Sequence, residues 1–163
     1  MSTEKLPITQ HGFLKLRSCL SKLIEQQDYI LRAIENGEQV DVSYSDIQKC
    51  FDRIDIPILC RKLGIFGIKG KIHKWLKIFV SNRTFQVRVN NTFSNETIVK
   101  SGIPQGSVLG PLLMLIMNFD MDKYLKSSEM KSFADDAAMM KGIKSKDDNE
   151  LFQEDLKAFP TDN

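Results

Sequence analysis

Two adjacent aspartates, Asp135 and Asp136, stand between short apolar segments of the sequence. Neighbouring carboxylates repel each other, and a divalent cation removes that cost. At the tip of a β-hairpin, both side chains could converge on one ion. Most Asp-Asp pairs only form turns, so this pair taken alone also fits an ordinary surface turn.

A second pair of carboxylates is formed by Asp46, at the end of a segment that we predict to be a buried strand, and Asp52, which follows it. An unpaired carboxylate at the end of a buried strand is costly, although Asp46 could also serve as a helix N-cap. If this strand lies beside the Asp135–Asp136 hairpin, three carboxylates meet at one edge of a sheet. That arrangement suits two Mg²⁺ ions that clamp the attacking and leaving oxygens of a phosphoryl transfer. The spacing in the sequence leaves this adjacency open.

The third feature is a loop of unusual composition, Ser101 to Pro111. Its glycines allow a close approach of the backbone to a ligand, Pro104 stiffens it, and Gln105 offers both a donor and an acceptor. The N-terminus of a following helix would favour an anion or a polar group nearby. The alternative is a helix-capping loop without a ligand, which we disfavour because the combination is too unusual for a simple turn.

The elements that must position these residues follow from hydrophobic periodicity and from turn residues. Between residues 16 and 36, apolar residues from Leu20 to Ile34 recur at helical spacing and predict a helix, with Gly37 able to serve as its C-cap. The order of elements predicts an α+β fold, with helices packed on one face of an antiparallel sheet. The expected helices span residues 16–36, 55–64, 71–80, 107 or 109–125 and 147–159; the expected strands are 40–47, 130–134 and 137–140, with a hairpin over 85–99.

The composition is that of a globular protein of 163 residues, with 42% hydrophobic and 27% charged residues and no linker that would divide it. A net charge of +2 is compatible with a nucleic-acid partner without pointing to one. The basic residues between 61 and 77 and around Arg83 and Arg88 could equally form a solvated face. The three cysteines lack the spacing of a zinc site or a disulfide framework, and no signal peptide or membrane span is visible. We therefore expect a soluble intracellular protein with no membrane partner, in nucleus or cytoplasm.

The ordered set of motifs resembles the reverse transcriptase domain of non-long-terminal-repeat retrotransposons, especially jockey-like elements of animals. Residues 101–113 match the family segment S-G-[VI]-P-Q-G-S-V-L-G-P-L-L, and residues 133–136 match F-A-D-D. Residues 46–52 match D-x-x-K-A-F-D, with Cys50 in place of the usual alanine. Residues 10–19 are similar to a fingers segment, Q-H-G-F-R-x-G-R-S-C. The resemblance runs from about residue 8 to residue 158.

The resemblance implies the palm of a right-hand polymerase over residues 40–163 and partial fingers over residues 1–39, treated as one domain. The implied activity is RNA-directed DNA synthesis from an RNA template, a DNA primer and deoxynucleoside triphosphates. Asp46, Asp135 and Asp136 would be the catalytic residues that bind two Mg²⁺ ions. The implied nucleotide-binding residues are Phe51, which would reject a 2′-hydroxyl, Gln105 and Gly106 beside the incoming nucleotide, and Arg17, a fingers contact to phosphate.

Besides Cys50, the chain departs from the family pattern at three positions. Leu14 replaces an arginine, Leu16 replaces a glycine, and Ala137 replaces a threonine. Losing the arginine removes a bidentate phosphate partner, and losing the glycine can alter the loop backbone.

The family also has early fingers strands, a lysine-bearing palm segment, a primer grip and a helical thumb, which we do not find in this sequence. Without a thumb, the basic surface alone would have to hold the primer–template duplex, so we expect the isolated chain to be inactive or nearly so. Whether this fragment is an enzyme stays open. The alternative is a non-enzymatic relic or a nucleic-acid-binding fragment. An RNA-dependent RNA polymerase is disfavoured, because such enzymes carry G-D-D where this chain has F-A-D-D.

Overall fold

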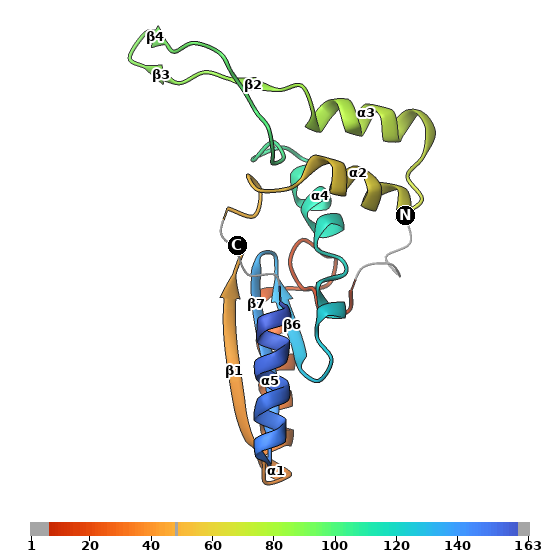
Figure 1. Ribbon diagram of the computed structural model, residues 1–163, viewed down its shortest axis with the longest axis vertical. Helices are drawn as coiled ribbons and strands as arrows, with labels where there is room; N and C mark the ends of the chain where they lie inside the picture. The colour runs from red at the N-terminus through yellow and green to blue at the C-terminus, as the bar shows by residue number, and fades with distance from the viewer. Residues whose placement is uncertain (1–6, 48, 160–163) are drawn as a thin grey trace. The chain divides into compact units, whose positions relative to one another are not determined.

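The computed structural model of the chain describes residues 7–47 and 49–159 (Figure 1). The parts of the expected fingers and palm at residues 1–6, 48 and 160–163 lie outside the described residues. By its contacts the chain divides into two compact units: unit 1 comprises residues 1–48 and 118–163, and unit 2 comprises residues 49–117. This division differs from the boundary between fingers and palm that we expect after residue 39. That boundary separates two roles in a polymerase, and it stays a prediction.

Unit 1 is built on a three-stranded antiparallel sheet of order β1-β7-β6. Its strands are β1 (Gln39–Asp46), β6 (Glu129–Phe133) and β7 (Asp136–Ile143), and its helices are α1 (Cys19–Glu35), α5 (Lys146–Ala158) and the short 3₁₀ helix η2 (Met121–Tyr124).

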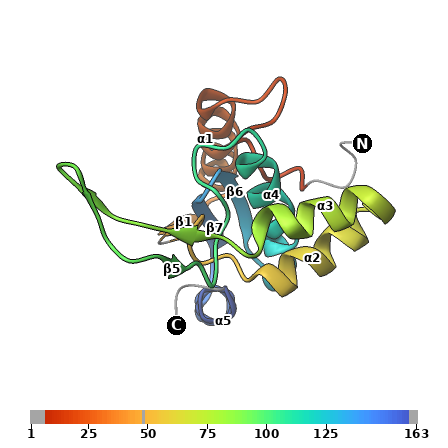
Figure 2. The same cartoon turned by 90° about the horizontal axis from the view of Figure 1, so that it is seen from above.

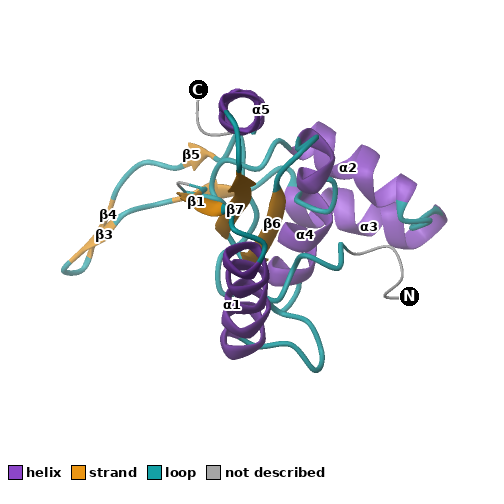
Figure 3. Cartoon of the chain, turned by 90° about the horizontal axis from the view of Figure 1, so that it is seen from below, coloured by secondary structure: helices purple, strands orange, loops and turns teal. Residues whose placement is uncertain are grey.

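Two helices cover opposite faces of this sheet: α1 lies on one face and α5 on the other (Figures 2 and 3). The mixed α/β character with antiparallel strands is therefore confirmed, but the prediction of helices on one face is wrong. The reason lies in the central strand β7, where the four consecutive residues Ala137 to Met140 are all buried. A strand whose residues are apolar on both sides requires cover on both faces of its sheet.

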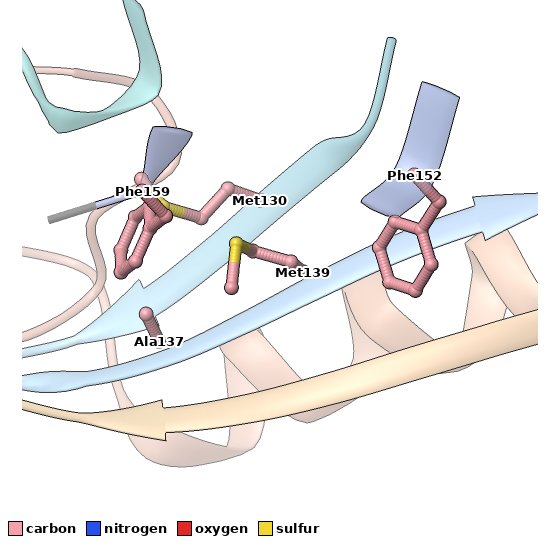
Figure 4. Close-up of a cluster of buried hydrophobic side chains, with 5 residues drawn as sticks. All are labelled: Met130, Ala137, Met139, Phe152 and Phe159. Carbon is pink, nitrogen blue, oxygen red and sulfur yellow. The ribbon is translucent and has the colours of Figure 1, made fainter. Parts of the chain in front are cut away.

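The face under α5 carries a compact apolar cluster (Figure 4). Met130 from β6 and Met139 from β7 pack with Phe152 and Phe159 from the C-terminal segment. Each such side chain, once fully buried, contributes about 1.5–3 kcal/mol to folding. A capping box formed by Ser145 starts α5, which fixes where Phe152 meets the sheet.

The other face is contacted by the polar side of α1. Lys22 and Gln26 are buried there, and Gln26 Nε2 donates to the hydroxyl of Tyr44 at 2.5 Å. The hydroxyl of Tyr29 accepts a hydrogen bond from the backbone N–H of Gly142 at 3.1 Å. The apolar stripe of this helix is not its buried face. Five residues of that stripe are more than half exposed: Leu20, Leu23, Ile24, Leu31 and Ile34.

Strand β1 has a single strand neighbour among the described residues, and none of its residues is fully buried. Tyr44 is 70% exposed, and Asp46 at its end is exposed. The predicted buried strand is thus an edge strand, because alternation in a sequence does not reveal how many neighbours a strand has.

Unit 2 contains the helices α2 (Ile56–Ile65), α3 (Gly70–Val80) and α4 (Gly110–Met117), with α2 packed against both α3 and α4. Asp55 caps α2 as predicted, since its carboxylate accepts from the N–H of Ile58 at 2.7 Å. The predicted hairpin is confirmed as two short ladders around the Asn90-Asn91 turn: β2 (Thr84–Phe85) pairs with β5 (Thr97–Ile98), and β3 (Arg88–Val89) pairs with β4 (Thr92–Phe93).

Helix α4 ends at Met117, so the helix expected to reach residue 125 is too long. After it, i to i+3 backbone bonds such as Met121 N–H to Asn118 O at 3.2 Å form tight turns that lead into η2. The apolar run stops at Asn118, and Asn and Asp side chains favour turns over helix interiors. Within residues 7–47 and 49–159, no helix has the length and apolarity that crossing a membrane requires.

Candidate functional site

The three predicted carboxylates lie together at one end of the unit 1 sheet. Asp46 is the last residue of β1 and is paired in register with Asp136, the first residue of β7. Asp136 is also paired with Phe133 on β6, so the hairpin between β6 and β7 closes through Ala134 and Asp135 alone. The adjacency that the sequence left open is therefore present in the fold.

The chemistry of this donor set fits a hard divalent cation, because carboxylate oxygens are the ligands that Mg²⁺ prefers. Asp46 and Asp136 are exposed and Asp135 is partly buried, so all three can be reached from solvent. Among the described residues, however, no three His, Cys, Asp or Glu side chains are gathered into a ready-made metal-binding group. The backbone places the three aspartates next to one another, but their three side chains do not form such a group.

Unit 2 contains the predicted nucleotide-binding loop, and the structure brings it against the segment that carries Phe51. The N–H of Ile103 donates to the carbonyl of Phe51 at 2.8 Å, and the N–H of Gly102 donates to that of Ile54 at 2.8 Å. Gly102 has a φ of +83°, and a Cβ there would lie 2.7 Å from the carbonyl oxygens of both Phe51 and Asp52. Glycine is therefore required at this position by conformation and by space.

Phe51 is partly buried, and its ring lies 3.3 Å from where a Cβ of Gly110 would be. Gln105 and Gly106 lie at the tip of the loop, where Gly106 has a φ of +77°. Gln105 lines a groove of unit 2 together with Asp52 and Phe85. All three predicted nucleotide-binding residues of unit 2 thus belong to one loop and the segment packed against it.

Arg83 has a structural role that the sequence did not reveal. Its guanidinium donates to the carbonyl of Gly102 at 2.5 Å and to that of Val80 at 3.0 Å. It therefore ties the end of α3 to the start of the loop. An arginine in a basic cluster gives no sequence signal for such a role, because the bond depends on residues that only the fold brings near.

Arg17 lies in unit 1, in the loop before α1. Its Nη1 donates to the carbonyl of Ile8 at 2.5 Å and lies 3.1 Å from Nε2 of the buried His11. Burial lowers the pKa of His11 from its ordinary value, and the charge of Arg17 lowers it further, against the opposing effect of Glu25. The predicted contact of Arg17 with a phosphate stays a prediction.

The sequence matches the family of reverse transcriptases (RNA-dependent DNA polymerases) over residues 2–161. The chain belongs to this family. It is 31% identical to the RNA-directed DNA polymerase from the mobile element jockey of Drosophila melanogaster, over 88% of this chain and 16% of that protein. It is 30% identical to the corresponding jockey protein of Drosophila funebris, over 96% of this chain and 18% of that protein. The chain therefore spans less than a fifth of the length of these relatives.

The fold is similar to that of telomerase. The structure of telomerase from Candida albicans in complex with a fragment of telomeric RNA matches 91% of this chain and 29% of that one, with a TM-score of 0.67 and 14% identity. Apo telomerase from Candida tropicalis matches 91% of this chain and 32% of that one, with a TM-score of 0.63 and 15% identity. At such identities the likeness concerns the fold alone.

One departure from the reverse transcriptase pattern is visible in the backbone. Leu16, which stands where the family has glycine, has a φ of +64° and is 94% exposed. The loop thus has the left-handed conformation for which glycine is suited, although a leucine occupies it. Because Leu16 keeps the left-handed conformation, we expect the leucine to lower the stability of the folded chain.

Proposed function

We propose that this chain forms the palm-centred core of an RNA-directed DNA polymerase. The reaction is the transfer of a deoxynucleotide from its triphosphate to the 3′-hydroxyl of a DNA primer paired with an RNA template. The observation that carries this proposal is the pairing of Asp46 with Asp136 across β1 and β7, with Asp135 in the adjoining turn. Membership of the reverse transcriptase family supports it.

Asp46, Asp135 and Asp136 would hold two Mg²⁺ ions at the end of the sheet. When bound, such ions favour deprotonation of the primer hydroxyl and neutralise charge on the triphosphate. The three carboxylates bind and orient, and the strand pairing keeps their backbone atoms in fixed register. Catalysis of this kind rests on positioning and electrostatics more than on covalent chemistry by the protein.

Phe51, Gln105 and Gly106 would receive the incoming deoxynucleotide. The ring of Phe51 would pack under the sugar and exclude a 2′-hydroxyl, while the exposed amide of Gln105 offers a donor and an acceptor. Backbone hydrogen bonds hold the loop against residues 51–54 and so keep these three residues in place. Arg17 would contact phosphate in the fingers, which we assign to residues 1–39, with the palm over residues 40–163.

A second candidate function is nucleic-acid binding without catalysis. It is favoured by Leu14 in place of the family arginine and by the absence, among the described residues, of carboxylates gathered into a metal-binding group. A binding fragment would keep its affinity for a primer–template duplex after its aspartates are changed, whereas polymerisation would be lost.

The test is primer extension by the full chain on oligo(dT)–poly(rA) with Mg²⁺. The variants Asp135→Asn and Asp136→Asn are compared with Glu154→Gln, which removes one exposed charge on α5. Extension by the unchanged chain and by Glu154→Gln, but not by the two aspartate variants, supports the proposal. If the chain is folded and binds the duplex but does not extend the primer, the result supports nucleic-acid binding without catalysis.

A further inference from the structure

A short segment of chain before α1 completes the sheet next to the candidate catalytic turn. The N–H of Ser132 donates to the carbonyl of Thr9 at 2.8 Å, and the N–H of His11 donates to the carbonyl of Ser132 at 2.8 Å. Gln10 is thereby bridged in parallel to Ser132 on β6. This brings residues from the start of the chain beside the hairpin that carries Asp135.

The side-chain amide of Gln10 bonds to both backbone polar groups of Ala134. Its Nε2 donates to the carbonyl of Ala134 at 3.1 Å, and its Oε1 accepts from the N–H of Ala134 at 2.9 Å. The same oxygen accepts from the N–H of Gly12 at 2.6 Å. Gln10 is only 4% exposed, so these bonds are shielded from water. A primary amide can be donor and acceptor to one residue at the same time, which a carboxylate or a hydroxyl does less well.

Ala134 needs such support because of its conformation. It is the first residue of the two-residue turn, and its φ of +57° lies in the left-handed region. An alanine adopts this conformation only where its surroundings hold it there. The next residue in the turn is Asp135, so the conformation of Ala134 determines the direction in which the chain delivers that carboxylate.

Gly12 gives an independent sign that the segment and the turn must approach closely. A Cβ at Gly12 would overlap the backbone nitrogen of Ala134 and lie 2.9 Å from its Cα. A side chain at this position would separate Gln10 from the turn. The amide contact of Gln10 and the missing side chain of Gly12 therefore serve the same close approach.

We propose that Gln10 is a positioning residue, which holds the Ala134–Asp135 turn so that Asp135 stays beside Asp136 and Asp46. Gly12 makes the contact possible. The role of Gln10 rests on the proposed function, because Gln10 acts on the reaction only through the carboxylates that it positions.

The test combines amide hydrogen exchange, Mn²⁺ binding and primer extension on the full chain. In Gln10→Ala, the amides of Ala134 and Gly12 should exchange about tenfold faster or more, because each loses its acceptor. The affinity for Mn²⁺, followed by electron paramagnetic resonance, should fall about tenfold, and kcat should fall with little change in KM for the nucleotide. Gln39→Ala is the matched control, since Gln39 is exposed and its amide contacts Asp41.

A second variant guards against loss of folding. Gln10→Glu keeps an acceptor for the N–H groups of Ala134 and Gly12 but loses the donor to the Ala134 carbonyl. It should restore protection of both amides while kcat stays below that of the unchanged chain. Unchanged exchange at Ala134 in Gln10→Ala overturns the inference, as does faster exchange with unaltered Mn²⁺ affinity.

These readouts separate the two proposals. If the unchanged chain neither binds Mn²⁺ nor extends a primer, the proposed function is refuted. The role of Gln10 in catalysis is then refuted as well, even if hydrogen exchange shows that Gln10 holds the turn. If the unchanged chain is active and Gln10→Ala matches Gln39→Ala in exchange, affinity and kcat, only the role of Gln10 is refuted.

Discussion

Asp46 and Asp136 are cross-strand partners at the end of β1 and the start of β7. Like charges directly opposite each other on neighbouring strands destabilise a sheet. The strands nevertheless place them there, in a protein whose net charge of +2 shows no general excess of acid. A cation bound between the two carboxylates would attract both and offset their repulsion.

The first prediction is that Asp46→Asn raises the free energy of unfolding without divalent metal, by about 0.5 kcal/mol, because it removes the repulsion. The same variant should lose the stabilisation that the unchanged chain gains from Mg²⁺. Thermal unfolding with and without about 10 mM Mg²⁺ measures both effects. Glu154→Gln is the control, and an equal gain from Mg²⁺ in the Asp46 variant would count against a metal at this pair.

The second prediction concerns Leu16, whose φ of +64° is unfavourable for a residue with a side chain. Leu16→Gly should stabilise the chain by about 0.5–1 kcal/mol, because the side chain is exposed and contributes little packing. Urea denaturation measures the difference. Leu31→Gly, at an exposed position in the interior of α1, should instead destabilise by about 1 kcal/mol, since glycine is a poor helix former. Destabilisation by Leu16→Gly would show that the side chain has contacts of its own.

The third prediction concerns Asp155, which is 1% exposed and accepts five hydrogen bonds from Lys126, Ser127 and Ser128. Burial acts to raise the pKa of this carboxyl, but the backbone N–H of Lys126 and the groups of the two serines outweigh it and hold the pKa well below the ordinary value. Asp155→Asn should cost about 3 kcal/mol at pH 7, because bonds to a charged acceptor are replaced by weaker ones.

The effect of pH follows from the direction of this shift. A carboxyl with a depressed pKa in the folded state stabilises the fold above its unfolded pKa, near 3.9, and loses that contribution as pH falls below it. The gap between the unchanged chain and Asp155→Asn should therefore be constant from about pH 7 to 5 and shrink below about pH 4. Urea denaturation across this range checks it, and a gap that does not depend on pH contradicts it.

The fourth prediction tests which face of α1 is buried. Leu23→Gln and Ile24→Gln should change the free energy of unfolding by less than about 0.5 kcal/mol, because both side chains are more than half exposed. Tyr29→Phe should cost about 1 kcal/mol, since the N–H of Gly142 loses its acceptor. Thermal unfolding distinguishes the two cases. Strong destabilisation by the leucine and isoleucine changes would contradict the exposure of the apolar stripe.

Several features could be predicted from the sequence because they depend on neighbours along the chain. The Asp55 cap, the Asn90-Asn91 turn and the strands on either side of Asp135 and Asp136 each involve residues only a few positions apart. These features are determined by hydrogen bonds within one turn and by the alternation of side chains along one strand. The order of the motifs along the chain likewise sufficed to identify the reverse transcriptase family.

What only the tertiary structure decided concerns residues that are far apart in sequence. The register of Asp46 with Asp136, the polar contact of α1 with the sheet and the bonds from Gln10 to Ala134 all join distant segments. The apolar stripe of α1 is exposed, and polar groups of the helix contact the sheet instead, as where the hydroxyl of Tyr29 accepts a hydrogen bond from the N–H of Gly142. Local patterns specify elements, whereas the pairing of strands and the satisfaction of buried polar groups depend on which elements meet. For that reason the carboxylates could be named from the sequence, but their place beside one another, and the residue that holds their turn, could not.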